Sequence, residues 1–155
     1  MRFKAALLLA TGLSATSVMP ALAIPVLFGG ANAPGANGAP LTNAAPGQVI
    51  TVTGSLLQLQ LADGSTVTAQ QGATFSVSSE VPATISLISG SLRVGSNGMP
   101  ISVTRGGVTI TTSNGTFSAT PQGPGLSGRI NVGTVQVFSG GNSRTLAVGQ
   151  RSGLG

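Results

Sequence analysis

The chain contains no cysteine, histidine, tryptophan or tyrosine, and only two of its 155 residues are acidic. Without cysteine there is no disulfide framework, and without both cysteine and histidine the usual zinc ligands, thiol nucleophiles and general bases are missing. A catalytic carboxylate pair would require Asp63 and Glu80 to face each other. Asp63 begins an Asp-Gly pair and Glu80 stands two residues before Pro82. We therefore expect two solvated loop residues, no catalytic residue and no enzyme activity.

Metal and nucleotide sites are not expected either. Calcium is held by several oxygen ligands, usually from more than one acid, and nothing in the sequence places Glu80 near Asp63. The glycines of "GGANAPG" have no preceding strand, no following helix and no Lys-Ser/Thr ending, so they do not form a phosphate-binding loop. The sequence predicts no cofactor.

Long apolar runs are also missing. The first 23 residues combine a basic start, an apolar run over Ala5–Leu9 and a small-residue ending at Ala23. This pattern is typical of a secretory signal peptide cleaved after Ala23, and it is interrupted too early for the roughly 20 residues of a membrane span. We expect a periplasmic or extracellular protein without a membrane span after cleavage.

Removal of 23 of the 155 residues leaves 132, enough for one domain. Five arginines then oppose two acids, a net charge of +3. They are dispersed, without lysine, tyrosine or tryptophan beside them, so we do not expect nucleic-acid binding. These arginines are Arg93, Arg105, Arg129, Arg144 and Arg151.

Apolar and polar residues alternate with a period of two from Val49 onward, which predicts strands with one buried face. Turn-forming pairs separate these runs, and glycine supplies the positive φ of tight hairpins. The expected turns are Asp63-Gly64, Asn97-Gly98, Asn114-Gly115 and Gly140-Gly141. The predicted fold is all-β over residues 49–155, a meander of hairpins forming a β-sandwich or a short irregular β-roll. Residues 24–48, rich in Gly, Ala, Asn and Pro, read as a flexible linker.

Arg93 and Arg105 are the candidate partner-facing residues. Arg93 alternates with Leu92 and Val94, so it points outward if they point inward, and Arg105 stands beside the turn before the next strand. Arginine forks suit carboxylates and other anions, so a shared anion-binding face is one interpretation. The other is that both are solvated residues of a weakly charged surface.

Four ordered segments carry a family resemblance: "LADGSTVTAQQGATFSV", "LISGSLRV", "VTRGGVTITTSNGTFSAT" and "TVQVFSGGNSRTLAVGQ". A strand ending in Asp-Gly-Ser is followed by Gly90–Val94, by a Gly-Thr-x-Phe strand at Gly115–Phe117 whose final valine is replaced, and by Leu146–Gln150. In order and spacing these segments resemble the FecR-domain family from about Val49 to Arg151.

The resemblance implies an all-β extracytoplasmic interaction or sensing module. In the best-known members it belongs to a regulator of iron-uptake signalling with a cytoplasmic sigma-factor-binding segment and one membrane span. Here a cleavable signal stands in place of those parts, so we expect a free-standing exported domain without direct sigma-factor regulation.

Two functions remain open. The first is a non-catalytic β-domain that binds an envelope or extracellular partner, either a protein or a polymer. The alternative is a structural subunit of a surface fibre or matrix, which would self-assemble through sheet edges because its strands carry few of the charges that prevent edge pairing.

Overall fold

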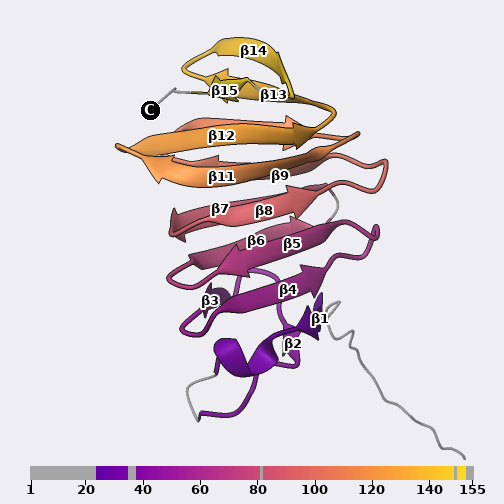
Figure 1. Ribbon diagram of the computed structural model, residues 1–155, viewed down its shortest axis with the longest axis vertical. Coiled ribbons are helices and arrows are strands. Elements are labelled where there is room, and N and C mark those ends of the chain that lie inside the picture. The colour runs from indigo at the N-terminus through magenta and orange to yellow at the C-terminus, as the bar shows by residue number, and fades with distance from the viewer. Residues whose placement is uncertain (1–23, 35–37, 81, 149, 153–155) are drawn as a thin grey trace, which may run out of the picture.

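Two β-sheets face each other in the computed structural model, which describes residues 24–34, 38–80, 82–148 and 150–152 (Figure 1). In spatial order the first sheet has eight strands: β15 (Arg151–Ser152), β12 (Gly125–Val132), β11 (Thr116–Gln122), β8 (Leu92–Gly95), β5 (Thr66–Gln70), β4 (Leu56–Gln60), β1 (Ile24–Phe28) and β2 (Asn43–Ala44). The second has seven: β14 (Asn142–Ala147), β13 (Thr134–Ser139), β10 (Val108–Thr112), β9 (Ile101–Arg105), β7 (Ala83–Ser89), β6 (Thr74–Glu80) and β3 (Val49–Thr51).

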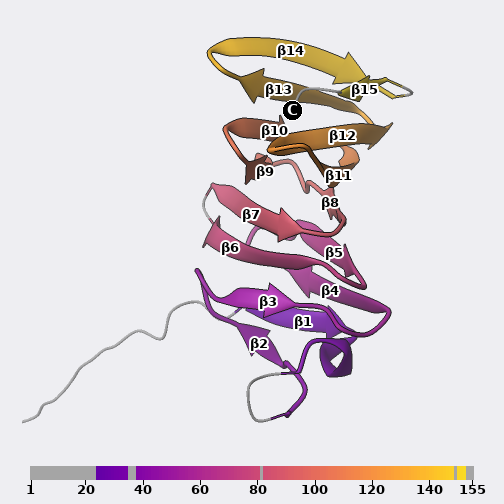
Figure 2. The same ribbon diagram turned by 90° about the vertical axis from the view of Figure 1, so that its left-hand side faces the viewer.

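The chain advances along the long axis of the molecule while it alternates between the sheets (Figures 1 and 2). Hairpin β4–β5 lies in the first sheet, β6–β7 in the second, β8 in the first, and β9–β10 in the second. Strand pairing is antiparallel except between β7 and β9, which pair in parallel. The prediction of an all-β fold is confirmed, and of the sandwich and the irregular β-roll that the sequence left open, two facing sheets form the sandwich. The strand order adds a progression of layers from the N-terminal to the C-terminal end.

Alternation along the strands builds the core between the sheets. The burial pattern of β4 is half-buried, buried, half-buried, buried, half-buried, and β5, β9 and β10 alternate in the same way. Phe75 of β6 and Phe117 of β11 are fully buried. The other large buried side chains are aliphatic, among them Leu57, Leu59, Ile85, Ile101 and Ile110. A mostly aliphatic core of this kind follows from a composition with few aromatics.

The described residues of segment 24–48 form part of the fold, which differs from the flexible linker that we expected. β1 pairs with β4, and Ile24 is fully buried. A short 3₁₀ helix, η2 (Gly30–Asn32), follows β1. The side chain of Asn32 donates a 2.7 Å hydrogen bond to the Leu56 carbonyl, and its own carbonyl accepts one from Thr53 N. These hydrogen bonds compensate for the conformational entropy that the segment loses when it becomes ordered. The composition of the segment gave no indication of them.

The four expected turns serve two different connections. Asp63-Gly64 and Gly140-Gly141 close the hairpins β4–β5 and β13–β14, with Gly64 at φ 88°. Asn97-Gly98 and Asn114-Gly115 instead carry the chain from one sheet to the other, so the expectation of hairpins there was wrong. An alternating pattern reports which face of a strand is buried, but not to which sheet the next strand belongs.

The predicted signal peptide, including the cleavage position at Ala23, lies outside the described residues. Within the part of the chain that the structure describes, no helix has the length and apolarity needed to cross a membrane.

Candidate functional site

Asp63 belongs to a hydrogen-bonded turn. Its carboxylate accepts a 2.9 Å bond from Ser65 N, and Gly64 N donates to the Leu61 carbonyl. The crossover residue Asn97 reaches the same turn, because its side-chain amide donates to the Asp63 carbonyl at 3.0 Å. Among the described residues no group of three or more acidic, histidine or cysteine side chains is positioned to hold a metal ion. Asp63 therefore stabilises the turn between β4 and β5.

The Asn114-Gly115 crossover is also bound to its neighbours. The side chain of Asn114 accepts a hydrogen bond from Thr134 N. Gly115 N donates to Ser96 Oγ, and Ser96 N donates to the Gly115 carbonyl. A Cβ on Gly115 would collide with the Val132 carbonyl. Asp63, Asn97, Asn114 and Gly115 thus connect neighbouring strands and crossovers at one end of the sandwich, and the bonds that they make are structural.

Arg93 and Arg105, the two candidate partner-facing residues, lie on different sheets and do not share a face. Arg105 ends β9, and its guanidinium is held by three backbone carbonyls. Nε donates to Ile88 O at 3.3 Å, and Nη1 donates to Gly123 O at 2.9 Å and to Gly125 O at 2.6 Å. These bonds connect β9 of the seven-stranded sheet to the β11–β12 turn of the eight-stranded sheet, so Arg105 links the two sheets.

Arg93 lies in a polar row that crosses the outer face of the eight-stranded sheet. Strand register pairs Gln58 with Thr68, Thr68 with Arg93, Arg93 with Ser118, and Ser118 with Arg129. Directly paired residues project on the same face of a sheet. We call these five residues the arginine row. Arg151 is the register partner of Arg129, and its side chain lies outside what the structure describes.

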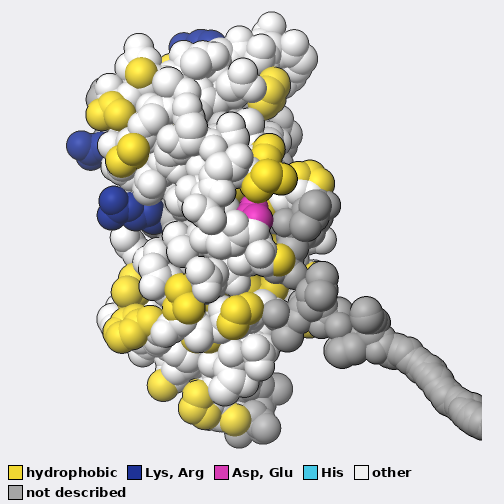
Figure 3. Space-filling model, turned by 90° about the vertical axis from the view of Figure 1, so that its right-hand side faces the viewer, with side chains coloured by type: hydrophobic (Ala, Val, Ile, Leu, Met, Phe, Trp, Pro, Cys, Tyr) yellow, Lys and Arg dark blue, Asp and Glu magenta, His cyan; other side chains and the backbone are white. Residues whose placement is uncertain are grey.

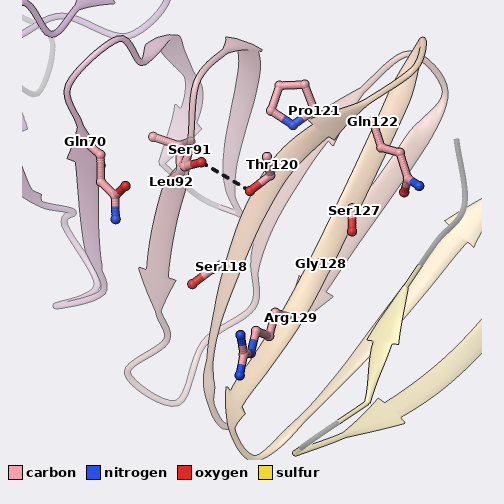
Figure 4. Close-up of a pocket in the computed structure, with 10 residues that line it drawn as sticks. All are labelled: Gln70, Ser91, Leu92, Ser118, Thr120, Pro121, Gln122, Ser127, Gly128 and Arg129. Carbon is pink, nitrogen blue, oxygen red and sulfur yellow. Dashed lines mark hydrogen bonds between the residues drawn. The ribbon is translucent and has the colours of Figure 1, made fainter.

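Two shallow hollows lie along this row. The larger, of about 500 Å³, is lined by parts of β5, β8, β11 and β12 and includes Ser118 and Arg129 (Figure 4). In Figure 4 the side chain of Arg129 turns toward the side on which Ser118 lies. The smaller, of about 250 Å³, includes Gln58, Thr68 and Arg93. Each hollow therefore contains one arginine and several side-chain hydroxyls or amides.

Both arginines of the row are exposed, and within the described residues neither makes a hydrogen bond or an ion pair through its side chain. Figure 3, a side view, shows basic side chains projecting along one margin of the molecule, with acidic groups almost absent from that view. An exposed guanidinium without a carboxylate keeps all of its N–H groups available for an external anion. The row offers guanidinium, hydroxyl and amide N–H or O–H donors to an anion, and none of its five residues is a carboxylate, histidine or lysine that could activate the Thr68 or Ser118 hydroxyl.

Sequence reasoning did not select Arg129. Its alternation with the buried Ile130 predicts an outward side chain, which the structure confirms. Its position two strands from Arg93 depends on β11 lying between β8 and β12, although β9 and β10 separate β8 from β11 in the chain. No local signal in the sequence indicates that arrangement.

No family model and no curated protein matches the chain. Solved structures that share its fold include two crystal structures, at 2.50 and 1.65 Å, of a "putative anti-sigma factor" from Parabacteroides distasonis ATCC 8503. Each has a TM-score of 0.57, with 17% and 15% sequence identity, and each match covers 67% of this chain and 53% of that one. The chain spans about half the length of the proteins it matches, and at this identity the likeness concerns the fold.

Proposed function

We propose that the protein is a non-catalytic, exported β-domain of the FecR type that binds an envelope or extracellular partner through the arginine row. The observation that carries the proposal is the pair Arg93 and Arg129, exposed on one face without a described internal partner. Other polar side chains of the fold, such as Arg105 and Asp63, are engaged within it. The fold shared with a "putative anti-sigma factor" supports a binding rather than a catalytic role.

The fibre-subunit alternative receives less support from the sheet edges. Within the described residues the two sheets have four edge strands, of which β2, β3 and β15 have two or three residues each. Short edge strands offer few unpaired backbone groups to another chain. The remaining edge, β14, carries Arg144. We therefore place the function on the sheet face and not on the edges.

The test is co-sedimentation of the purified protein with bacterial envelope material. The wild-type protein is expected to sediment with the envelope, and Arg93→Gln and Arg129→Gln are each expected to release most of it. Arg144→Gln is the matched control, because it removes the same charge from the other sheet. It keeps a polar side chain at the β14 edge, is used at concentrations at which light scattering finds it monomeric, and should sediment like wild type. Absence of wild-type binding, or equal loss in all three variants, would contradict the proposal.

A further inference from the structure

We propose that the partner of the arginine row is a polysaccharide carrying carboxylate groups. This inference rests on the proposed function, and it adds the chemical class of the ligand. The row has two positive charges and no acid, while the only acidic residue with a described side chain, Asp63, lies in the turn between β4 and β5. Charge complementarity therefore calls for an anion, and the planar guanidinium fork matches the two oxygens of a carboxylate.

The side chains around the arginines suit a sugar chain. Gln58, Thr68 and Ser118 belong to the row, and Thr66, Ser91, Thr116 and Thr120 lie on the walls of the two hollows. Hydroxyls and amides both donate and accept hydrogen bonds, as sugar hydroxyls do. Two pairs among them bond to each other, Gln58 to Thr68 at 3.2 Å and Ser91 with Thr120 at 3.2 Å. Such bonds fix the orientation of these groups before a ligand arrives.

The geometry of the row favours a linear ligand. The row runs across the strands and therefore along the long axis of the molecule (Figure 1). Its residues line both hollows. Arg93 and Arg129 are separated by the single strand β11, so their backbones are about 10 Å apart, twice the spacing of neighbouring strands. A polymer with repeated acidic sugars can thus meet both arginines at once.

Other macromolecules fit this surface less well. A protein interface of standard type has an apolar centre enriched in aromatic residues, but the arginine row contains neither. Single-stranded nucleic acids are bound on aromatic stacking platforms. No aromatic residue is among the lining of either hollow. Acidic proteins and phosphate polymers are therefore alternative outcomes of the test and not part of the proposal.

The experiment measures binding of a fluorescently labelled oligogalacturonate to the purified protein by polarisation. We expect binding at least about tenfold tighter than to labelled dextran, which has no charge, and weakening as sodium chloride is raised. Arg93→Gln and Arg129→Gln should each weaken binding by about tenfold, the loss expected for one charge-assisted contact. Arg144→Gln should change it by less than about twofold. Unchanged thermal midpoints would show that the exposed-site variants remain folded.

Competing polymers decide the ligand class. Polyphosphate or polyglutamate that binds through the same two arginines as tightly as oligogalacturonate would overturn the polysaccharide assignment while leaving the proposed binding face intact. Failure to bind oligogalacturonate, with envelope co-sedimentation still dependent on Arg93, would have the same meaning. Equal weakening by Arg144→Gln would overturn the role of the row itself, since only net charge would then matter.

Discussion

At the scale of single residues, the two arginines selected from the sequence, Arg93 and Arg105, have different surroundings. Arg93 stands in the middle of a strand whose neighbours on the outer face are Thr68 and Ser118, so nothing described neutralises it. Arg105 stands at a strand end, where the carbonyls of a glycine-rich turn converge on its guanidinium. A charged donor shared among several backbone carbonyls contributes more to stability than an exposed charge without a partner. Arg105 is therefore a structural residue and Arg93 is available for binding.

Replacing Arg105 tests this division. Arg105→Gln removes the bonds to Gly123 O and Gly125 O and leaves the buried Gly125 without this donor. We expect the free energy of unfolding to fall by about 1–3 kcal/mol, measured by urea denaturation. Arg93→Gln is the control and should stay within about 0.5 kcal/mol of wild type. Equal stability of the two variants would show that the carbonyl contacts of Arg105 contribute nothing.

The adjacent glycines of the β9–β10 hairpin provide a second residue-scale prediction. Gly106 and Gly107 both have positive φ, 59° and 84°. A Cβ on Gly106 would meet the Pro124 carbonyl, whereas a Cβ on Gly107 would have nothing within 4 Å. Both alanine variants therefore suffer left-handed strain of about 1–2 kcal/mol. Gly106→Ala should lose at least about 1 kcal/mol more than Gly107→Ala, because the hairpin must also move away from Pro124. Similar unfolding midpoints for the two would contradict the packing of this turn against the other sheet.

At the scale of elements, β14 is the edge strand most able to pair with a strand of another molecule. It is the only described edge strand longer than three residues. Arg144 pairs in register with Val137, which is fully buried, so the arginine projects on the core-facing side of the edge strand. A charge in that position opposes the stacking of a second sandwich onto the edge, because the added strand would desolvate it.

Replacing this charged side chain with an apolar, β-branched one is expected to promote self-association. The wild-type protein is expected to stay monomeric, whereas the mass of Arg144→Val in light scattering should grow with concentration. Thr145→Val is the control on the same strand, because Thr145 pairs with the exposed Gln136 on the outer face. It should remain monomeric at concentrations where Arg144→Val grows. Wild-type protein that already forms large species would instead favour the fibre-subunit function.

The elements that sequence reasoning found were those with a full two-residue period. The two-residue alternation from Val49 onward predicts that the apolar members of each strand, such as Phe75/Val77, Ile101/Val103 and Ile130/Val132, share a buried face. Phe75, Val77, Ile101 and Val103 are buried. Val132 was expected to share the buried face of Ile130, yet it is 56% exposed where β12 passes a register irregularity against β11. Irregularities of this kind depend on the partner strand, which the local pattern does not report.

The N-terminal strand β1 was missed for a related reason. Its sequence, IPVLF, has no clear alternation, and its order depends on backbone pairing with β4. The arginine row was missed because it depends on strand neighbours that are distant in the chain. A periodic pattern thus predicted most strands, while edges, crossovers and the candidate site required the tertiary arrangement.

At the scale of the whole molecule, successive strands and hairpins are stacked as layers along the long axis, in the order in which they occur in the chain. Each layer contacts mainly the layer before and the layer after it, and the two ends are covered by short or exposed strands: β2 and β3 at one end and β14 and β15 at the other. In such an arrangement, stability is approximately a sum of layer and interface terms. The central strands have neighbours on both sides, and the fully buried Phe75 and Phe117 lie within them.

Native-state hydrogen exchange should therefore show a gradient from the centre toward both ends. Amides of β5, β8, β9 and β10 should exchange most slowly, near the rate set by global unfolding, and those of β2 and β14 should exchange fastest. Val103→Ala, a cavity in the central β9, should speed exchange throughout the central strands. Leu146→Ala in the edge strand β14 should speed exchange mainly in β13 and β14. If Leu146→Ala accelerated every strand equally, the protein would open as a single cooperative unit, and the layered description of its stability would be wrong.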